Sequence, residues 1–494
     1  SDVKNSGNLG ANVVLANKMV IENGATLRTA AAVTTNSPIK FETEAGGIIE
    51  NPNDFTANKT LSGTVAYKKG GGTLILTNNN TSLNKLVVVA GTVKNQAITI
   101  PAKMVELQGG TLTESSSTSY AISVAKGKSA TWNLAERNSY TNKITGEGTL
   151  SIYCPLVSGG SWMAPRTHVK CNMSEFEGTI KPQMPYKDNR FTLDNSYGLP
   201  KATMDIPEGM EVQNTGKVFA IGKVTGTGAL GGLVDFGNGV SGYNTWKVGN
   251  ETNYRWSGKV TGTNTAFVKI GTGKLTAGAG WDNTGSVKVA EGELCLTSGN
   301  VIGTGAVTVD KDARLSGVTG TTALTNSSFT INGELVVGAF ANATSGKINF
   351  GGKNVTISST GKYVVGKGSY SNTTIENVNT LTINGTIEVV LASSYTPKDG
   401  DVLTLWTANH FAGTPNYVLP NLPLGMAWDM SKISEGKLTI VSDPTAIGVV
   451  PFGAKYGHND IYDLKGQLVR KNATSTEGLP SGVYFRNGKK IVVK

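Results

Sequence analysis

A short stretch in the middle of the chain indicates the fold. Gly271-Thr-Gly-Lys-Leu275 is followed by Ser286-Val-Lys-Val289 and then by Gly292-Glu-Leu294. In each piece, a turn rich in Gly, Ser or Asn leads into a few residues that alternate between apolar and polar. Such alternation between turn residues is typical of short β-strands with one buried and one exposed face. The pattern therefore predicts strands rather than helices.

The same turn-to-strand unit recurs along the chain. It has the form Gly-x-Gly-x-Leu or Gly-x-Gly-x-Val, at residues 70–74, 146–150, 226–230, 271–275 and 303–307. A second unit, residues 287–294, recurs as residues 307–315 with Asp312 in place of the Gly. The units share no fixed long period. This disfavours a propeller and favours a parallel β-helix, in which the length of each coil can vary.

Stacking gives the physical reason for this prediction. One coil cannot bury its inward Leu, Val and Ile residues alone, whereas coils stacked about 4.8 Å apart pair every strand with its neighbours. About 400 residues at about 20 to 25 per coil predict on the order of 16 to 20 coils and a rod of about 80 to 95 Å. Gly and Asn supply the positive-φ corners between the faces. We therefore expect an all-β protein built as a β-solenoid.

Changes in the pattern predict three parts. Residues 1–398 are expected to form the parallel β-helix, residues 399–442 its closing coils, and residues 443–494 a small C-terminal β domain. The repeats are interrupted near residues 152–200, which we expect to form an irregular excursion. Such an excursion is either a loop that covers one face of the solenoid or a place for functional residues on a rigid scaffold.

Composition and charge exclude several classes of protein. The chain has 494 residues, of which 63 are Gly and only 16 are Pro, and it lacks a Gly-X-Y period, so it is not a collagen. The net charge is +10, and half of it lies in the last 42 residues. No basic cluster interleaved with aromatic residues suggests a nucleic-acid partner.

No apolar stretch approaches the roughly 20 residues of a transmembrane helix. The sequence after Ser1 does not contain the apolar region of a secretory leader. A leader that was cleaved off before Ser1 would give the same sequence, so this observation does not decide whether the protein is secreted.

A polysaccharide lyase or a glycoside hydrolase is the enzyme alternative, because β-helices often carry these activities. A glycosidase needs two carboxylates about 5 to 9.5 Å apart. The candidate acids are Glu175, Glu177, Asp188, Asp194, Asp310 and Asp312, and the candidate bases are Arg166 and Arg190. No pair of these acids recurs with a supporting Arg or His. We therefore assign no catalytic residue.

An aromatic group is the main candidate for ligand binding. Tyr243, Trp246, Tyr254 and Trp256 lie close together in the sequence, and Trp162 and Arg190 add an aromatic ring and a charge in the irregular region. Aromatic rings stack on the apolar faces of sugars, and Thr, Asn and Ser ladders offer hydroxyl and amide groups. The alternative is that these rings cap or line the core.

No spacing of residues predicts a metal site or a cofactor. His168, His410 and His458 are far apart in the sequence and lack metal-ligand spacing. Three acids near the end of the repeats, Asp399, Asp401 and Asp429, are compatible with a Ca²⁺ site, but we favour turn and cap roles for them.

Three cysteines are too few for a disulfide scaffold. Cys154 and Cys171 are close enough in sequence to pair, but two unpaired thiols explain them equally well. Cys295 has no Cys or His near it in the sequence and is not expected to be catalytic.

The central region resembles the autotransporter-associated β-strand repeat proteins. The matching residues are Phe267 to Thr276, Trp281 to Leu294 and Gly303 to Val309, and the likeness covers about residues 216–348. The resemblance implies a right-handed parallel β-helix that is exported to the cell surface or the medium.

Two further segments carry resemblances. Residues 399–440 are similar to the closing module that often follows such repeats, in which Trp406 and Trp428 can supply an apolar lid over the last coil. The tail, from Ile461-Tyr-Asp-Leu-Lys-Gly466 through Gly482-Val-Tyr-Phe485 to Lys494, resembles the C-terminal sorting domain of type IX (Por) secretion in Bacteroidetes. This resemblance implies that secretion machinery is a partner.

Taken together, these observations predict a secreted or cell-surface β-solenoid. We expect an adhesin-like or glycan-contacting structural protein that has no catalytic activity and binds polysaccharide or host and cell-surface glycans. The alternative is a polysaccharide-degrading β-helix enzyme that uses carboxylates of residues 152–200.

Overall fold

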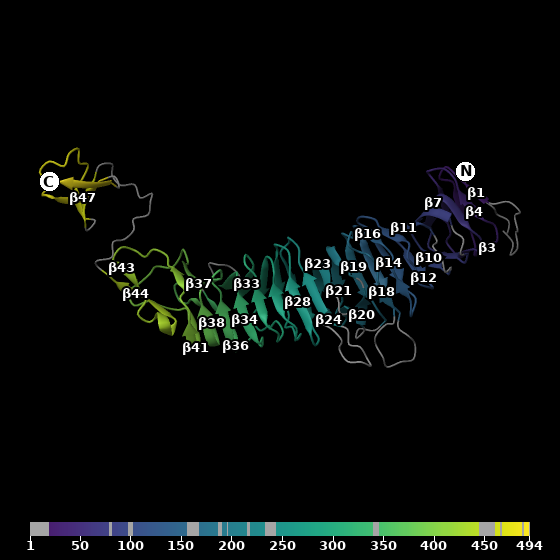
Figure 1. Ribbon diagram of the computed structural model, residues 1–494. Coiled ribbons are helices and arrows are strands. Elements are labelled where there is room, and N and C mark those ends of the chain that lie inside the picture. The colour runs from purple at the N-terminus through teal and green to yellow at the C-terminus, as the bar shows by residue number, and fades with distance from the viewer. Residues whose placement is uncertain are drawn as a thin grey trace.

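The protein is a parallel β-solenoid of about 16 turns, with 56% of its residues in strands and 1% in helix. The computed structural model describes residues 19–78, 82–96, 102–155, 167–185, 190–194, 196–214, 218–232, 244–338, 345–443, 460–464, 467–486 and 489–493. The coils stack into a long, slightly curved rod (Figure 1). The predicted parallel β-helix is confirmed, and the number of turns agrees with the lower end of the expected range.

Four parallel sheets form the sides of the rod. The N-terminal sheet consists of β1 (Met19–Ile21), β2 (Thr26–Arg28), β4 (Ile39–Phe41), β5 (Gly47–Glu50), β7 (Leu61–Lys69), β9 (Ser82–Val88), β11 (Met104–Leu107), β13 (Ala121–Val124) and β16 (Ile144–Gly146). The middle sheet consists of β15 (Ser139–Tyr140), β18 (His168–Val169), β20 (Arg190–Leu193), β22 (Glu211–Asn214), β24 (Ala229–Gly232) and β27 (Lys259–Val260). The C-terminal sheet consists of β26 (Tyr254–Trp256), β29 (Lys274–Ala277), β31 (Glu293–Leu296), β33 (Arg314–Gly317), β35 (Glu334–Val337), β37 (Lys362–Lys367), β39 (Thr386–Leu391) and β42 (Asn416–Val418).

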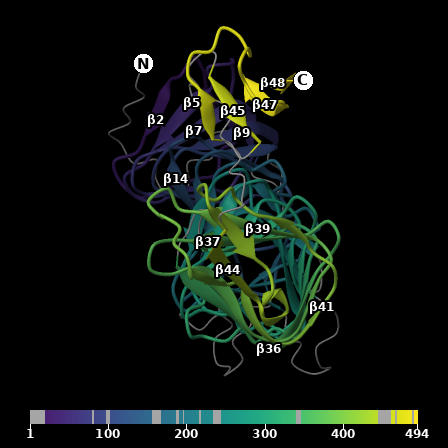
Figure 2. The ribbon, with the colours of Figure 1, turned by 90° about the vertical axis from the view of Figure 1, so that its left-hand side faces the viewer.

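The fourth sheet, the long sheet, runs beside the other three. It consists of β3 (Val33–Thr35), β6 (Phe55–Ala57), β8 (Thr73–Leu76), β10 (Thr92–Asn95), β12 (Thr111–Glu114), β14 (Ser129–Asn133), β17 (Thr149–Tyr153), β19 (Thr179–Gln183), β21 (Leu199–Ile206), β23 (Val218–Gly226), β25 (Asn244–Val248), β28 (Thr265–Lys269), β30 (Val287–Val289), β32 (Val307–Val309), β34 (Ser328–Ile331), β36 (Gly346–Ile357), β38 (Thr373–Ile383) and β41 (Trp406–Ala412). Viewed from one end, the coils lie one behind another around a shared interior (Figure 2).

The interior is built from ladders of side chains that stay in register from coil to coil. In the long sheet, Leu74 pairs with Val93, which pairs with Leu112, and all three are fully buried. A second ladder in the C-terminal sheet joins Leu275, Leu294 and Leu315 in the same way. Because side chains alternate along a strand, every second residue points inward and stacks on its equivalent in the next coil. This stacking explains why a short alternating pattern is enough to form the core.

A small antiparallel sheet covers the C-terminal end of the rod. It consists of β40 (Val402–Thr404), β44 (Lys437–Ser442) and β43 (Met426–Asp429), and the short 3₁₀ helix η1 (Ile433–Glu435) precedes β44. Trp406 is buried and stacks on Phe411 with ring centroids 4.6 Å apart, while Trp428 is partly buried against the core. Both tryptophans thus lie at the end of the core, as predicted for a lid.

The tail contains a second antiparallel sheet. It consists of β46 (Leu468–Arg470), β45 (Ile461–Asp463), β47 (Gly482–Arg486) and β48 (Lys489–Val493). Its own small core holds Ile461, Ala473 and Tyr484. The tail therefore contains short strands, as its sequence predicts, and they form a small β unit.

Candidate functional site

An open groove of about 600 Å³ lies on the outer face of the middle sheet, at β22, β24 and β27. Its lining residues come from residues 209–211, 227–232, 257–263 and 279–284, which belong to four adjacent coils. At the strand spacing, these coils cover about 14 Å along the rod. The groove can therefore contact a ligand that spans several coils.

The sequence of the central strand explains why a groove forms here. The outward positions of β24 are Ala229 and Gly231, on either side of the inward Leu230. On the flanking strands, the residues in register with Ala229 are Glu211 and Lys259, which have long side chains. Small residues on the middle strand between longer ones leave a trough whose floor is nearly bare backbone.

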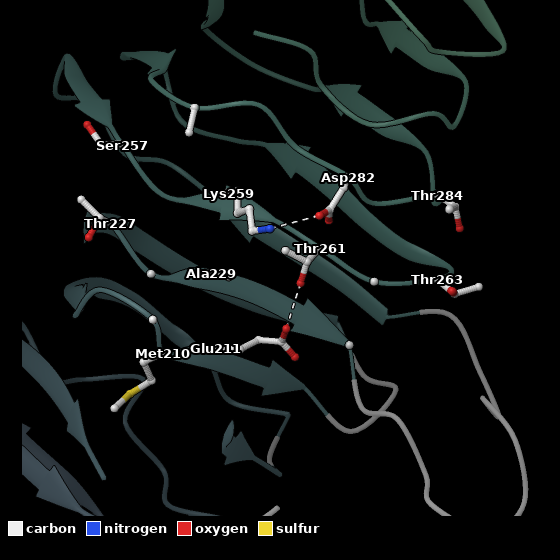
Figure 3. Close-up of a pocket in the computed structure, with 15 residues that line it drawn as sticks. Met210, Glu211, Thr227, Ala229, Ser257, Lys259, Thr261, Thr263, Asp282 and Thr284 are labelled. Atoms are coloured by element: carbon white, nitrogen blue, oxygen red, sulfur yellow. Dashed lines mark hydrogen bonds and ion pairs between the residues drawn. The ribbon is translucent and has the colours of Figure 1, made fainter. Parts of the chain in front are cut away.

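Glu211 reaches across this floor (Figure 3). A Cβ atom at Gly231 would lie 2.5 Å from Glu211 Oε1, so only glycine leaves room for this path. The Glu211 carboxylate accepts a hydrogen bond from Thr261 Oγ1 at 3.1 Å and another from Gln213 Nε2 at 2.7 Å. The absence of a side chain at one position thus lets an acid of one coil bind a hydroxyl two coils away.

The remaining polar groups come from the next coils. Lys259 Nζ lies 3.1 Å from Asp282 Oδ2, and both side chains are about half exposed. The hydroxyl groups in the lining belong to Thr227, Ser257, Thr261, Thr263 and Thr284. The charged lining residues are two acids and one lysine, so the groove has a net charge of −1.

The backbone below the groove is held by a buried tryptophan. Trp246 Nε1 donates a hydrogen bond to the carbonyl oxygen of Gly231 at 3.0 Å, and the indole packs edge-on against Phe219 with ring centroids 5.6 Å apart. Trp246 itself is fully buried. It supports the floor from inside the rod instead of contacting a ligand.

Gln213 lies on β22 beside Glu211, but it is not among the residues that line the groove. The side chain is fully buried, and its Nε2 donates to Glu211, but its Oε1 has no hydrogen-bond partner within the described part of the chain. Buried polar atoms are normally paired, because leaving one unpaired costs about 1–3 kcal/mol. Gln213 therefore acts on the groove through its hydrogen bond to Glu211.

A second groove, of about 490 Å³, lies on the C-terminal sheet along a ladder of alternating charge. The ladder consists of Lys274, Glu293, Arg314, Glu334 and Lys362, joined by ion pairs between neighbouring coils. Burial alone would raise the pKa of Glu334, but hydrogen bonds from Lys362 and Arg314 lower it below its ordinary value. Each charge already has a partner of opposite sign, which favours a structural role for this ladder.

The same pairing accounts for the acids that were candidates for catalysis. Glu175 pairs with Lys143 at 2.7 Å, Glu177 with Lys201 at 3.1 Å, and Asp310 with Lys288 at 2.8 Å. The hydrogen bond from Lys143 lowers the pKa of Glu175, which is the wrong direction for a general acid. In each pair the lysine belongs to a neighbouring coil.

The remaining candidates for catalysis are Asp194, Asp312, Asp188, Arg166 and Arg190. Asp194 Oδ2 lies 3.5 Å from both His168 Nδ1 and Lys170 Nζ. Asp312 occupies a positive-φ corner with φ 67°. Asp188 and Arg166 lie outside the described residues, as does the side chain of Arg190, whose backbone begins β20.

The predicted aromatic group is mostly inside the rod. Trp246 and Trp256 are fully buried, and Tyr254 is partly buried at the head of the leucine ladder, next to Leu275. Neither tryptophan presents a ring face to solvent, so sugar stacking on these two rings is corrected to a core role. Tyr243 and Trp162 lie outside the described residues.

Strand alternation explains this placement. Trp246 lies between the outward Thr245 and Lys247, and Trp256 follows the exposed Arg255. This pattern was the signal in the sequence for a core position. In contrast, nothing local marked Glu211 or Gly231, since the groove depends on residues from several coils.

All three cysteines are free and buried. Cys154 and Cys171 therefore do not form a disulfide bond, which agrees with the second of the two interpretations left open by the sequence. Burial raises the pKa of both thiols far above the ordinary value. A thiol that stays protonated is a poor nucleophile. These side chains behave as small core residues.

The acids near the end of the rod make turn and cap contacts. Asp399 Oδ1 accepts a hydrogen bond from the Ser442 backbone N–H at 2.6 Å, and Asp429 Oδ1 accepts one from the Ser431 N–H at 2.8 Å. Asp401 Oδ2 accepts from the Tyr395 hydroxyl at 2.6 Å. The structural interpretation of these acids is confirmed by their contacts.

Within the described ranges, no group of three or more His, Cys, Asp or Glu side chains is arranged to hold a metal ion. His410 lies exposed on β41, whereas His458 is outside those ranges. Among the helical residues that the structure describes, none form a helix long and apolar enough to cross a bilayer.

No protein-family model and no curated protein matches the chain. The fold therefore comes from the structure itself, and a β-solenoid suits a structural or binding role.

Proposed function

We propose that this protein is a secreted or cell-surface β-solenoid that contacts glycans through the outer face of its rod and performs no catalysis. The observation that carries the proposal is the groove on β22, β24 and β27, with its hydroxyl groups, two carboxylates and one lysine. Sugars are recognised by such groups, and a pocket of several hundred Å³ is of the usual size for a ligand site.

Pairing of charges between coils supports a binding role over an enzymatic one. The acids Glu175, Glu177 and Asp310 are each neutralised by a lysine of another coil. A glycosidase instead needs one carboxyl group with a raised pKa opposite a second, ionised one. Glu175, in contrast, has its pKa lowered by the hydrogen bond from Lys143.

The resemblances supply the proposed setting and partners. The likeness of residues 216–348 to autotransporter-associated repeats favours export to the cell surface or the medium of a Bacteroidetes-type bacterium, with an adhesin-like role. The likeness of the tail to type IX sorting domains favours an interaction with secretion machinery. The right-handed winding of the β-helix belongs to the same proposal. So does the division of the chain into a β-helix up to residue 398, closing coils up to residue 442 and a C-terminal domain.

A panel of polysaccharides tests the proposal. The purified protein is incubated with each polymer, and both retention on the polymer and new reducing ends are measured. We expect retention on at least one polymer without new reducing ends. New reducing ends that disappear in Glu175→Gln or Asp188→Asn would support the polysaccharide-degrading alternative and contradict the proposal.

A further inference from the structure

We infer that the groove on β22, β24 and β27 binds a neutral, hydroxyl-rich glycan chain in preference to an acidic one. This inference rests on the proposed function and names the class of glycan. It is carried by the charge, the hydrogen-bonding groups and the shape of the groove.

The charge of the groove disfavours acidic sugars. Glu211 and Asp282 line it, and the single lysine, Lys259, already pairs with Asp282. A uronate or sulfate group would approach two carboxylates with no free cation among the lining residues. Like charges brought together at an interface oppose binding, so an uncharged sugar is favoured.

The hydrogen-bonding groups require a ligand that donates. The carboxylates of Glu211 and Asp282 in the lining accept hydrogen bonds. Sugar hydroxyl groups donate hydrogen bonds and also accept them from the threonine hydroxyls of the lining. An acceptor-rich groove therefore matches a polyhydroxylated chain.

The groove suits a ligand that contacts several coils at once. The floor at Ala229 and Gly231 is flanked by Glu211 on one side and by Lys259 and Thr261 on the other. The polar groups differ from coil to coil, because Glu211, Ala229 and Lys259 occupy equivalent positions. A polymer whose linked units reach more than one coil gains affinity, because these units bind in one encounter.

Retention of the full chain on neutral and acidic polysaccharides tests the inference. The probes are dextran, xylan and mannan as neutral polymers, and polygalacturonate and alginate as acidic ones. We expect retention on a neutral polymer, at most weak retention on acidic ones, and little change between about 0.05 and about 0.5 M salt, since screening affects charged partners.

Two variants assign the binding to the groove. Glu211→Gln keeps the shape but removes the charge-assisted hydrogen bond, and we expect about tenfold weaker retention. Gly231→Val fills the floor and displaces the Glu211 side chain, and we expect retention to be lost. Circular dichroism and the melting temperature establish that both variants are folded.

Glu106→Gln is the matched control. Glu106 Oε1 accepts a hydrogen bond from Gln108 Nε2 at 2.6 Å, as Glu211 does from Gln213, but Glu106 lies on β11 in the N-terminal sheet. Its substitution should leave retention unchanged. Retention that survives both groove variants, or that favours acidic polymers, would overturn the inference while the proposed function stands. Retention on no polymer at all would contradict both.

Discussion

Two buried lysines occupy equivalent corners of the rod and explain one part of the repeat. Lys269 Nζ donates to the carbonyl oxygens of Ile270, Gly271 and Glu291 at 2.7–3.2 Å, and Lys68 makes the same three kinds of contact. Burial lowers the pKa of each lysine to about 8, so both remain mostly protonated at neutral pH. Each ammonium donates to two backbone oxygens of its own turn and to one of the next coil, which gives the Lys-x-Gly-x-Gly-x-Leu pattern a structural meaning.

A buried acid lies in the interior of the N-terminal half. Glu114 accepts hydrogen bonds from the Tyr120 hydroxyl, from Asn95 Nδ2 at 2.9 Å and from Trp132 Nε1 at 3.3 Å. Burial raises the pKa of Glu114 above its ordinary value of 4.5, although these hydrogen bonds act in the opposite direction. The folded protein thus holds this proton at pH values where the unfolded chain has lost it.

The sign of the resulting pH dependence follows from linkage. The stabilising contribution of protonated Glu114 is fully present below pH 4.5 and is lost as the pH rises through the higher folded pKa. Glu114→Gln cannot ionise, so we expect the variant to lose this part of the pH dependence. Urea unfolding between about pH 4 and about pH 8 measures it.

Glu334→Gln is the control for this experiment. The pKa of Glu334 is lowered, so its contribution to stability is present at neutral pH and lost on acidification. The two variants should therefore change the pH dependence of the free energy of unfolding in opposite directions. An unchanged profile for Glu114→Gln would contradict the buried-acid interpretation.

At the scale of the element, the corners between strands decide where a side chain is tolerated. Gly292 and Asp312 hold the same corner of successive units, with φ of 65° and 67°. A Cβ at Gly292 would lie 2.4 Å from the Gly271 carbonyl oxygen and 2.6 Å from that of Gly273. Both residues line the open groove on the C-terminal sheet, and Asp312 carries a side chain at its corner.

Gly292→Ala should therefore be strongly destabilising. The positive φ alone costs about 1–3 kcal/mol for a residue with a Cβ, and the close backbone oxygens add to this cost. Asp312→Gly, which relieves strain at the matching corner, should be neutral or mildly stabilising. Chemical denaturation of both variants measures the difference, and equal stabilities would contradict the corner assignment.

At the scale of the whole molecule, each coil depends on its neighbours. The rod is stabilised by ladders and by ion pairs between coils, so stability is a sum of local terms and of the interfaces between coils. The last coil has a neighbour on one side only, and the antiparallel sheet of β40, β44 and β43 covers the other side. Tyr363 ties the coils to this end through a hydrogen bond from its hydroxyl to the Leu405 carbonyl oxygen at 2.6 Å.

Trp406→Ala should loosen the C-terminal end alone. Removing a fully buried tryptophan costs about 3–5 kcal/mol, and in a repeat structure the loss stays local. Hydrogen exchange should become faster in β39 and β41 and remain unchanged in β10, β12 and β14. Faster exchange along the whole rod would show instead that the solenoid unfolds as one cooperative unit.

The sequence by itself determined the solenoid, because inward and outward residues alternate over neighbouring positions and the corners need Gly or Asn wherever φ is positive. Units such as residues 271–275 carry both signals within a few residues. The same alternation applies to Trp246 and Trp256, but the sequence alone left both a core role and a ligand-binding role open for these rings.

Only the tertiary structure decided the groove. Glu211 and Thr261 are 50 residues apart in the sequence and meet because one coil stacks on the next across Gly231. The variable length of the coils hides this contact from any fixed spacing in the sequence. For the same reason, the pairing of Glu175, Glu177 and Asp310 with lysines of other coils became visible only once the strand register was known, because charges meet across the stack and not along the chain.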